Sequence, residues 1–205
     1  MYDFSGNSDS ILHRHFKMYK PYGYLSQFLS YSKDERKKRF LGKLYAFPAN
    51  IMAIGRLDEK SEGLLLLTTD GKVSTLITGS SIEKEYYVLV DGDITEEAIK
   101  LMQQGVEIGF KGIKYITKPC KVFKLNENPK FPERCKKIRD DRHGPTSWIS
   151  VTISEGKFRQ VRKMTSAVGF PTLRLVRVRI GNLYLDNLNV GEVKELNYEF
   201  FKKEL

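Results

Sequence analysis

Residues 55–63 read Gly-Arg-Leu-Asp-Glu-Lys-Ser-Glu-Gly, and Leu64-Leu65-Leu66-Leu67-Thr68 follows at once. The four leucines predict a strand that is buried on both faces, and the turn signal Thr69-Asp70-Gly71 ends it. The polar residues before this strand therefore form a loop on a stiff support. Asp58 lies in the middle of the loop and is the first candidate for a reactive side chain.

The composition indicates a globular protein whose positive charge either suits a polyanionic partner or serves solubility alone. A chain of 205 residues can form one large domain or two small lobes that share a core. Its hydrophobic content of 40% argues against disorder of the whole chain. The formal net charge of +10 suits a phosphate-rich partner, because lysines and arginines that neutralise phosphates release counterions.

The cysteine and hydropathy patterns indicate a reducing compartment. Cys120 and Cys135 do not form a CxxC pair, which favours free thiols over a disulfide or a zinc site. His13 and His15 lack neighbouring cysteines or carboxylates, so no metal site is expected there. No apolar run has membrane-spanning length, and no signal-peptide core is present. A cytoplasmic monomer without metal or cofactor is the expectation.

The predicted elements are mostly strands. Strands are expected at 16–20, 64–68, 83–90, 148–154 and 173–185, with several short strands between 106 and 125. Helices are expected near 73–79, at 96–104 with Thr95 as N-cap, and at 157–168 with Val161, Met164 and Val168 buried. Strands and helices do not alternate regularly, so the fold class is α+β.

Three polar segments fall between or before these elements. Residues 1–15 are expected to form a flexible tail and residues 16–205 a single domain of two lobes. The charge-dense segment 33–40 is either a solvated loop or a phosphate contact. Residues 126–144 are predicted to form a mobile basic loop, which carries Arg134, Lys136, Lys137, Arg139 and Arg142 among its side chains.

The loop around Asp58 and two later blocks resemble the RNA pseudouridine synthases. Residues 55–71 are similar to the aspartate-bearing signature of the branch that modifies ribosomal RNA from a GRLD loop. Residues 84–88 resemble the family's Lys-x-Tyr-x-Val strand, and residues 155–164 and 173–181 resemble its later blocks in the same order. The KPxG turn at 20–23 resembles the start of the family's catalytic domain.

The resemblance implies a fold, a reaction and a set of site residues. The fold would be a mixed, mostly antiparallel sheet with a central catalytic cleft and few flanking helices. The reaction would convert uridine to pseudouridine without a cofactor, with Asp58 as the family's catalytic aspartate, Tyr86 as its tyrosine and Arg162 as the cation beside the aspartate. Asp58 would attack the sugar C1′, attack C6 of the base, or act through a glycal; the sequence leaves these three routes open.

The remaining implied contacts concern the flipped base and the RNA backbone. Val161 would pack under the base, and Arg56 would fill the gap left by the flipped nucleotide or contact a phosphate. Phosphate contacts are expected from a group of basic residues: Lys60, Arg159, Lys163, Arg174, Arg177 and Arg179. No room is left for the separate N-terminal RNA-binding domain that many relatives carry, so the catalytic domain would capture RNA itself.

The sequence differs from common family residues at two positions, and two rival functions remain open. Phe158 stands where relatives commonly have asparagine, and Glu62 matches a subgroup that acts on large-subunit rRNA, which residues 145–148 also resemble. One rival is a retaining glycosidase or nucleosidase that pairs Asp58 with Glu62, because such enzymes need two carboxylates. The other rival is a basic RNA-binding or ribosome assembly protein without catalytic activity.

Overall fold

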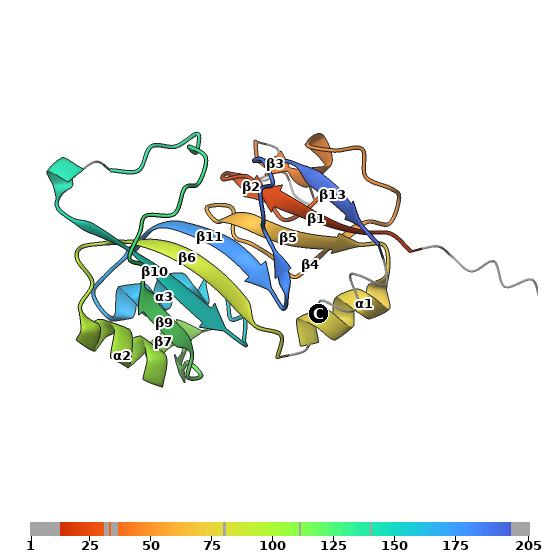
Figure 1. Ribbon diagram of the computed structural model, residues 1–205. Helices are drawn as coiled ribbons and strands as arrows, with labels where there is room; N and C mark the ends of the chain where they lie inside the picture. Colours follow the sequence, from red (N-terminus) through yellow and green to blue (C-terminus); the bar gives the residue numbers. More distant parts are fainter. Residues whose placement is uncertain are drawn as a thin grey trace, which may run out of the picture.

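The computed structural model describes residues 13–30, 33, 37–79, 81–110, 112–139 and 141–197. In this part of the chain nine strands form one sheet, in which β13, β1, β5, β11, β6, β10 and β9 lie in that order (Figure 1). Strand β4 pairs with β5, and β12 pairs with β11. Within this sheet only β5 and β11 pair in parallel, so the predicted α+β fold with a mostly antiparallel sheet is confirmed.

The strands of the large sheet are β1 (His15–Lys20), β4 (Met52–Ile54), β5 (Glu62–Thr68), β6 (Lys84–Asp91), β9 (Lys121–Lys124), β10 (Thr146–Ile153), β11 (Thr172–Ile180), β12 (Leu183–Tyr184) and β13 (Val193–Leu196). Two small sheets consist of β2 (Tyr24–Leu25) with β3 (Arg39–Phe40), and of the hairpin β7 (Glu107–Phe110) with β8 (Ile113–Ile116). The helices are α1 (Gly71–Gly79), α2 (Glu96–Gln104) and α3 (Gln160–Ala167), and short 3-10 turns occupy η2 (Leu41–Lys43) and η3 (Asp141–His143).

Strand β5 is the centre of the packing. All seven of its residues are buried, as the leucine run predicts. Side chains alternate along a strand, so Leu65 and Leu67 join the core on one face of the sheet, whereas Leu64 and Leu66 join a second core on the other face. The continuous leucine run is therefore needed to fill two cores at once.

The parallel contact between β5 and β11 requires a glycine. Gly63 has φ of +100°, and a Cβ atom built on it would lie 2.3 Å from the carbonyl oxygen of Arg177. Any larger residue would force the two strands apart at this point. Gly63 thus sets how closely the residues before β5 approach β11.

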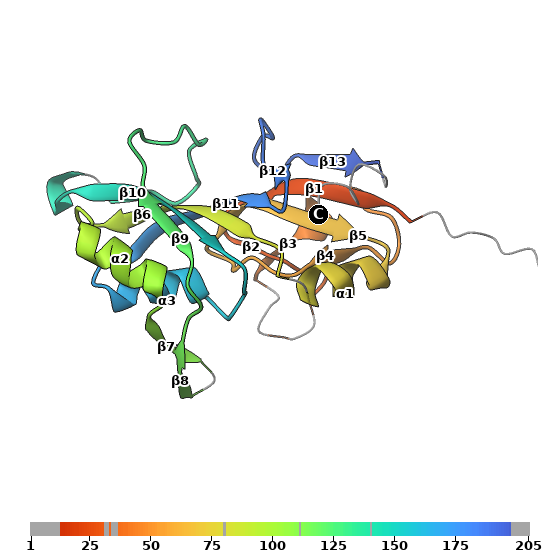
Figure 2. The same ribbon diagram turned by 60° about the horizontal axis from the view of Figure 1, so that its bottom comes forward.

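The helices follow the expected signals, with one correction. In α2 the Thr95 side chain accepts a hydrogen bond from the Ala98 amide, and Gly105 follows the last residue, as predicted. Helix α3 begins at Gln160 rather than at residue 157, because Arg159 adopts the left-handed conformation with φ of 54°. Helices α2 and α3 lie beside each other under the β6–β10 half of the sheet, and α1 lies beside β4 and β5 (Figures 1 and 2).

The basic segment before β10 is anchored, contrary to the prediction of a mobile loop. Arg139 forms an ion pair with Asp91, and the Arg134 guanidinium donates to the Leu173 carbonyl and lies 4.7 Å from the centre of the Tyr22 ring. Phe131 packs on Trp148 with 5.7 Å between ring centres. These contacts fasten the segment across the sheet.

At the N-terminal end, strand β1 begins one residue earlier than expected. Residue 15, which the sequence places in the tail, is a buried histidine in β1, and Arg14 pairs with Glu195 of β13. Residues 1–12 of the predicted tail lie outside the described residues. The division into a tail and one two-lobed domain remains a prediction, although a single sheet runs through both halves.

A buried ion pair joins β5 to β11 on the face that carries the second core. Arg174 donates to both carboxylate oxygens of Glu62, at 3.1 and 2.8 Å, and to the Pro132 carbonyl at 2.8 Å. The two side chains are only 7% and 1% exposed. Removing one partner of such a pair leaves the other charge buried and uncompensated.

We therefore predict that Glu62→Gln lowers the free energy of unfolding by about 3 kcal/mol, because the amide presents a donor to a guanidinium that needs acceptors. Urea unfolding would measure the change. Glu59→Gln is the matched control, because Glu59 pairs with Lys38 on the surface and should contribute about 1 kcal/mol or less. Equal stability of the two variants would contradict the structural role of Glu62.

Candidate active site

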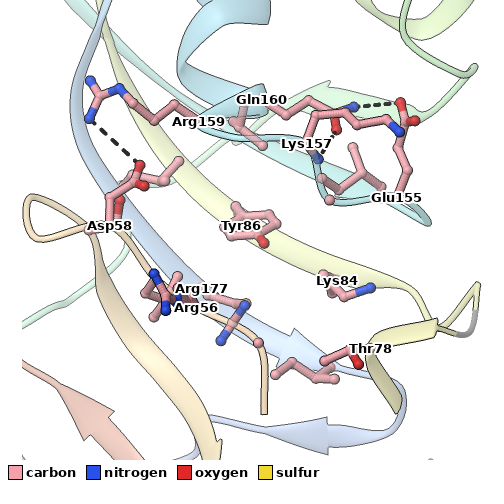
Figure 3. A pocket seen from close by; sticks show the side chains of 18 of the residues that line it. Arg56, Asp58, Thr78, Lys84, Tyr86, Glu155, Lys157, Arg159, Gln160 and Arg177 are labelled. Carbon is pink, nitrogen blue, oxygen red and sulfur yellow. Dashed lines mark hydrogen bonds and ion pairs between the residues drawn. The ribbon is translucent and has the colours of Figure 1, made fainter. Parts of the chain in front are cut away.

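A pocket of about 260 Å³ lies where the Asp58 loop, β6, β11 and the start of α3 meet (Figure 3). The predicted site residues that line it are Arg56, Asp58, Tyr86, Arg159, Val161, Arg162 and Arg177. They come from four separate stretches of the chain. The structure thus brings the three candidate catalytic residues into one cavity.

Hydrogen bonds to Ser26 and within the turn hold the loop that carries Asp58 in place. Leu57 is buried, and both its amide and its carbonyl bond to the Ser26 hydroxyl, at 3.0 and 2.8 Å. The Ser61 amide donates to the Asp58 carbonyl at 3.0 Å and closes a turn. The Asp58 side chain is 23% exposed, so it faces the pocket from a fixed backbone.

Lys20 supports this loop and was not identified from the sequence. Its side chain is fully buried, and its ammonium donates to the Ser61 carbonyl at 2.8 Å and the Pro21 carbonyl at 3.0 Å. Burial lowers the pKa of Lys20 to about 7, although the nearby Glu62 and Asp58 carboxylates oppose this shift. The available signal was a lysine at the end of a predicted buried strand, directly before the KPxG proline.

Two guanidinium groups flank the Asp58 carboxylate. Its Oδ2 atom lies 3.9 Å from Arg162 Nε and 3.7 Å from Arg159 Nη1. Arg162 is held in place because its Nη2 donates to the Lys60 carbonyl at 2.7 Å. Burial lowers the pKa of Arg162, and the charge of Arg159 adds to this effect. The expected cation is therefore beside Asp58, together with Arg159, which had been expected only at a phosphate.

Tyr86 and Val161 form apolar walls of the pocket. Tyr86 lies on β6 and is 8% exposed, and Val161 lies in the first turn of α3 and is 4% exposed. Figure 3 shows the Tyr86 ring in the middle of the pocket, between Asp58 and Lys84. An aromatic face and an aliphatic side chain can hold a planar ring between them.

Arg177 lines the pocket itself, and the other candidate phosphate contacts divide into two groups. Arg56 and Lys60 are exposed near the pocket, and Lys163 lies beside Arg159 in a neighbouring hollow between α3 and β7. The Lys163 ammonium donates to the Gly109 carbonyl and lies 5.3 Å from the centre of the exposed Phe158 ring. We call Arg56, Lys60, Lys163 and Arg159 the basic rim of the pocket.

Arg174 and Arg179 do not reach this rim. Arg174 is buried against Glu62 on the other face of the sheet, and Arg179 pairs with Glu83 and Glu85 at 3.1 and 2.9 Å. Both guanidinium groups are committed to carboxylates. We therefore correct the sequence-based expectation that these two arginines contact RNA phosphates.

A carboxylate that the sequence analysis did not single out fixes the start of α3. Glu155 accepts hydrogen bonds from the Tyr115 hydroxyl at 2.5 Å, the Lys118 amide at 2.9 Å and the Gln160 side chain at 2.6 Å. Burial would raise the pKa of Glu155, but these hydrogen bonds outweigh it and lower the pKa. Glu155 therefore ties hairpin β7–β8 to the first turn of α3, next to Arg159 and Arg162.

The arrangement argues against a glycosidase that uses Asp58 with Glu62. Glu62 is paired with Arg174 and is not among the residues that line the pocket.

Within the described ranges, no cluster of three or more histidine, cysteine or acidic residues has the geometry to hold a metal ion. None of the helices in those ranges has the length and apolar character needed to span a membrane.

The chain thus combines a mostly antiparallel sheet with one parallel pair and a pocket that places an aspartate near two arginines and a tyrosine. A family model described as RNA pseudouridylate synthase matches residues 14–167, and the chain belongs to this family. The family predicted from the sequence is thus confirmed, and the chain is an isomerase that acts on RNA.

Individual relatives agree with this assignment. The chain is 41% identical to a ribosomal large subunit pseudouridine synthase E of Xanthomonas axonopodis, over 82% of this chain and 86% of the relative. It is 39% identical to the protein of that name from Vibrio vulnificus, over 87% and 73% of the two chains. A crystal structure of a pseudouridylate synthase is 28% identical and has a TM-score of 0.72 over 94% of this chain and 74% of that one.

The burial of Lys20 leads to a pH prediction for wild type and Lys20→Met. The folded pKa of about 7 lies below the ordinary value of 10.5, so the folded protein binds fewer protons than the unfolded chain between these two pH values. Its free energy of unfolding should therefore rise with pH in this window, relative to Lys20→Met, by roughly 1.4 kcal/mol per pH unit. Urea unfolding at several pH values measures the difference.

Lys38→Met serves as the control for this pH series, because Lys38 is exposed and pairs with Glu59 on the same loop. Its stability should follow the wild-type curve across the window. Parallel curves for wild type and Lys20→Met would show that the Lys20 ammonium stays charged in the folded protein.

Proposed function

We propose that this protein converts a uridine of large-subunit ribosomal RNA to pseudouridine, with the Asp58 carboxylate as the reacting group. The position of Asp58 in the pocket, between Arg159 and Arg162, is the observation that carries this proposal. The large-subunit target is supported by relatives of that name, which are about 40% identical over more than four-fifths of this chain.

The reaction redistributes bonds within one nucleotide. The bond from N1 to C1′ breaks, C5 bonds to C1′, the C5 proton leaves, and N1 gains a proton. Asp58 would attack C1′, attack C6 of the base, or assist the loss of the C2′ proton on the way to a glycal. Each route needs a carboxylate that is negatively charged and reachable from one side of the nucleotide, and two adjacent guanidinium groups stabilise that charge.

Tyr86 and Val161 would hold the base while it is detached from the sugar. Taking a uridine out of its stack costs a few kcal/mol, and stacking on an aromatic face recovers part of this cost. The two walls are buried, so the pocket restricts the escape of the base and the entry of water. The Tyr86 hydroxyl is placed in the same pocket as Asp58 and is the candidate to move the C2′ proton.

The basic rim would hold the RNA backbone on either side of the flipped nucleotide. Arg159 and Lys163 lie on one side of the pocket, and Arg56 and Lys60 lie on the loop that carries Asp58. Each phosphate that these side chains neutralise releases counterions and favours binding. Phosphate contacts position the RNA, and the fit of the pocket then selects the base.

We predict that Asp58→Asn abolishes the reaction and retains RNA binding. Cells that lack the gene would be complemented with wild type or variant, and pseudouridines would be mapped in all ribosomal RNA. Wild type should restore one or more pseudouridines in large-subunit rRNA, and Asp58→Asn should not. In vitro, release of tritium from C5-labelled uridine should fall at least about 1000-fold.

Glu59→Gln is the matched control, because it removes a carboxylate from the adjacent residue, which pairs with Lys38. It should release tritium at nearly the wild-type rate. A wild type that binds rRNA and makes no pseudouridine would support a binding or assembly protein instead. Pseudouridine restored only in another RNA would overturn the large-subunit target and keep the chemistry.

The basic rim predicts a change in the salt dependence of RNA binding. Lys163→Gln should weaken binding to rRNA and lower the slope of log K against log salt by about 1, because one phosphate contact is lost. Arg179→Gln should leave this slope unchanged, since its guanidinium pairs with Glu83 and Glu85. Filter binding at several salt concentrations tests both, and equal slopes for the two variants would contradict the assignment of the rim.

A further inference from the structure

Arg177 is a buried cation in the pocket that lacks a carboxylate partner in the described part of the chain. The residue is 3% exposed, and its Nε donates to the Leu64 carbonyl at 2.7 Å. Its Nη2 atom is buried and finds no acceptor among the described residues. The side chain nevertheless lines the same cavity as Asp58 and Tyr86.

The strand register directs Arg177 into the pocket. Arg177 lies opposite Tyr86, whereas Arg179 lies opposite Glu85, because β11 is irregular between these two arginines. Tyr86 and Glu85 are neighbours on β6 and point to opposite faces of the sheet. The irregularity therefore turns Arg179 to the face with the carboxylates and keeps Arg177 on the face with the pocket, near Tyr86 and Arg56 (Figure 3).

The other two arginines of β11 have carboxylate partners, unlike Arg177. Arg174 is neutralised by Glu62, and Arg179 by Glu83 and Glu85. A buried donor that has no acceptor costs free energy. A hydrogen bond in which one partner is charged is stronger than a hydrogen bond between two neutral groups. Arg177 thus has hydrogen-bonding capacity that a ligand with an acceptor oxygen can satisfy. Lys84, farther along the pocket, has its pKa lowered by burial and by the charge of Arg177.

We propose that Arg177 is a specificity-determining residue that donates a hydrogen bond to a carbonyl oxygen of the flipped uracil. This inference rests on the proposed function. A base is the free end of its nucleotide and can reach a buried guanidinium beside Tyr86. A phosphodiester is flanked by two sugars and stays with the backbone, near the exposed cations of the rim.

Such a contact selects uracil over cytosine when the acceptor is O4. Cytosine carries an amino group at that position, and two donors would then face each other in a buried site. A site built to donate to a substrate oxygen rejects an analogue without that oxygen, because its own polar group is left unpaired. When the acceptor is O2, the same contact holds the base in a fixed position relative to its sugar.

The test is a double-mutant cycle between Arg177 and the base carbonyls. The substrate is an rRNA stem-loop with the uridine that mapping identifies, made with a single uridine, 2-thiouridine or 4-thiouridine labelled with tritium at C5. Arg177→Met removes the guanidinium and keeps an apolar stem, and Arg177→Lys keeps the charge. Lys121→Met, which removes an exposed cation paired with Glu83, is the control. Single-turnover tritium release and thermal melting are measured for each protein.

With wild type and Lys121→Met, sulfur at one of the two positions should slow release about tenfold, because sulfur is a weaker acceptor. Arg177→Met should slow release from the uridine substrate by roughly tenfold to a hundredfold and lose this sulfur effect. Arg177→Lys should keep wild-type melting and retain part of the sulfur effect. The position that shows the coupling identifies O2 or O4 as the acceptor.

If Arg177→Met slows tritium release by the same factor relative to wild type on all three substrates, the proposal is overturned. Arg177 would then have a purely structural role. A fourth substrate carries a methylphosphonate beside the target nucleotide. If Arg177→Met is coupled to this change alone, and to neither sulfur substitution, the proposal is overturned in favour of a phosphate contact. Failure of the wild type to release tritium from uridine would refute the proposed function itself, and is distinguishable from both of these results.

Discussion

The parallel contact between β5 and β11 is the constraint on which the site depends. Gly63 allows the two strands to approach so closely that a Cβ atom at this position would overlap the Arg177 carbonyl. The Asp58 loop enters β5 directly before this contact, and Arg177 lies within it. Backbone pairing between β5 and β11 therefore holds the loop that carries Asp58 next to Arg177.

Arginines serve two distinct purposes in this fold. Arg174 and Arg179 are bound to carboxylates and hold strands together, whereas Arg159, Arg162 and Arg177 line the pocket. The net charge of +10 does not distinguish these purposes, because both groups count equally in it. The distinction depends on which carboxylates the fold places beside each guanidinium, and this is decided by strand register.

The sequence predicted those features that depend on local patterns. The leucine run, the Thr95 cap and the aspartate loop are each encoded by adjacent residues, and the structure agrees with all three. Features set by long-range contacts were not predictable. The start of α3 depends on the left-handed Arg159, and the assignment of Arg179 depends on an irregularity in β11 that breaks the alternation of period two. Lys20 and Glu155 act through partners about 40 residues away.

The arginines that flank Asp58 stabilise its charge without occupying its lone pairs. Distances of 3.7 and 3.9 Å from Oδ2 permit Coulomb attraction but exceed the range of a hydrogen bond. Arg162 instead donates to the Lys60 carbonyl, so it is positioned by the loop backbone rather than by the carboxylate. A carboxylate that is bonded in the manner of Glu62 would have to break two strong hydrogen bonds before it could react. The Asp58 carboxylate remains accessible because the arginines beside it are fixed by other contacts. In the proposed function, this difference separates the reacting carboxylate from a structural one only four residues away.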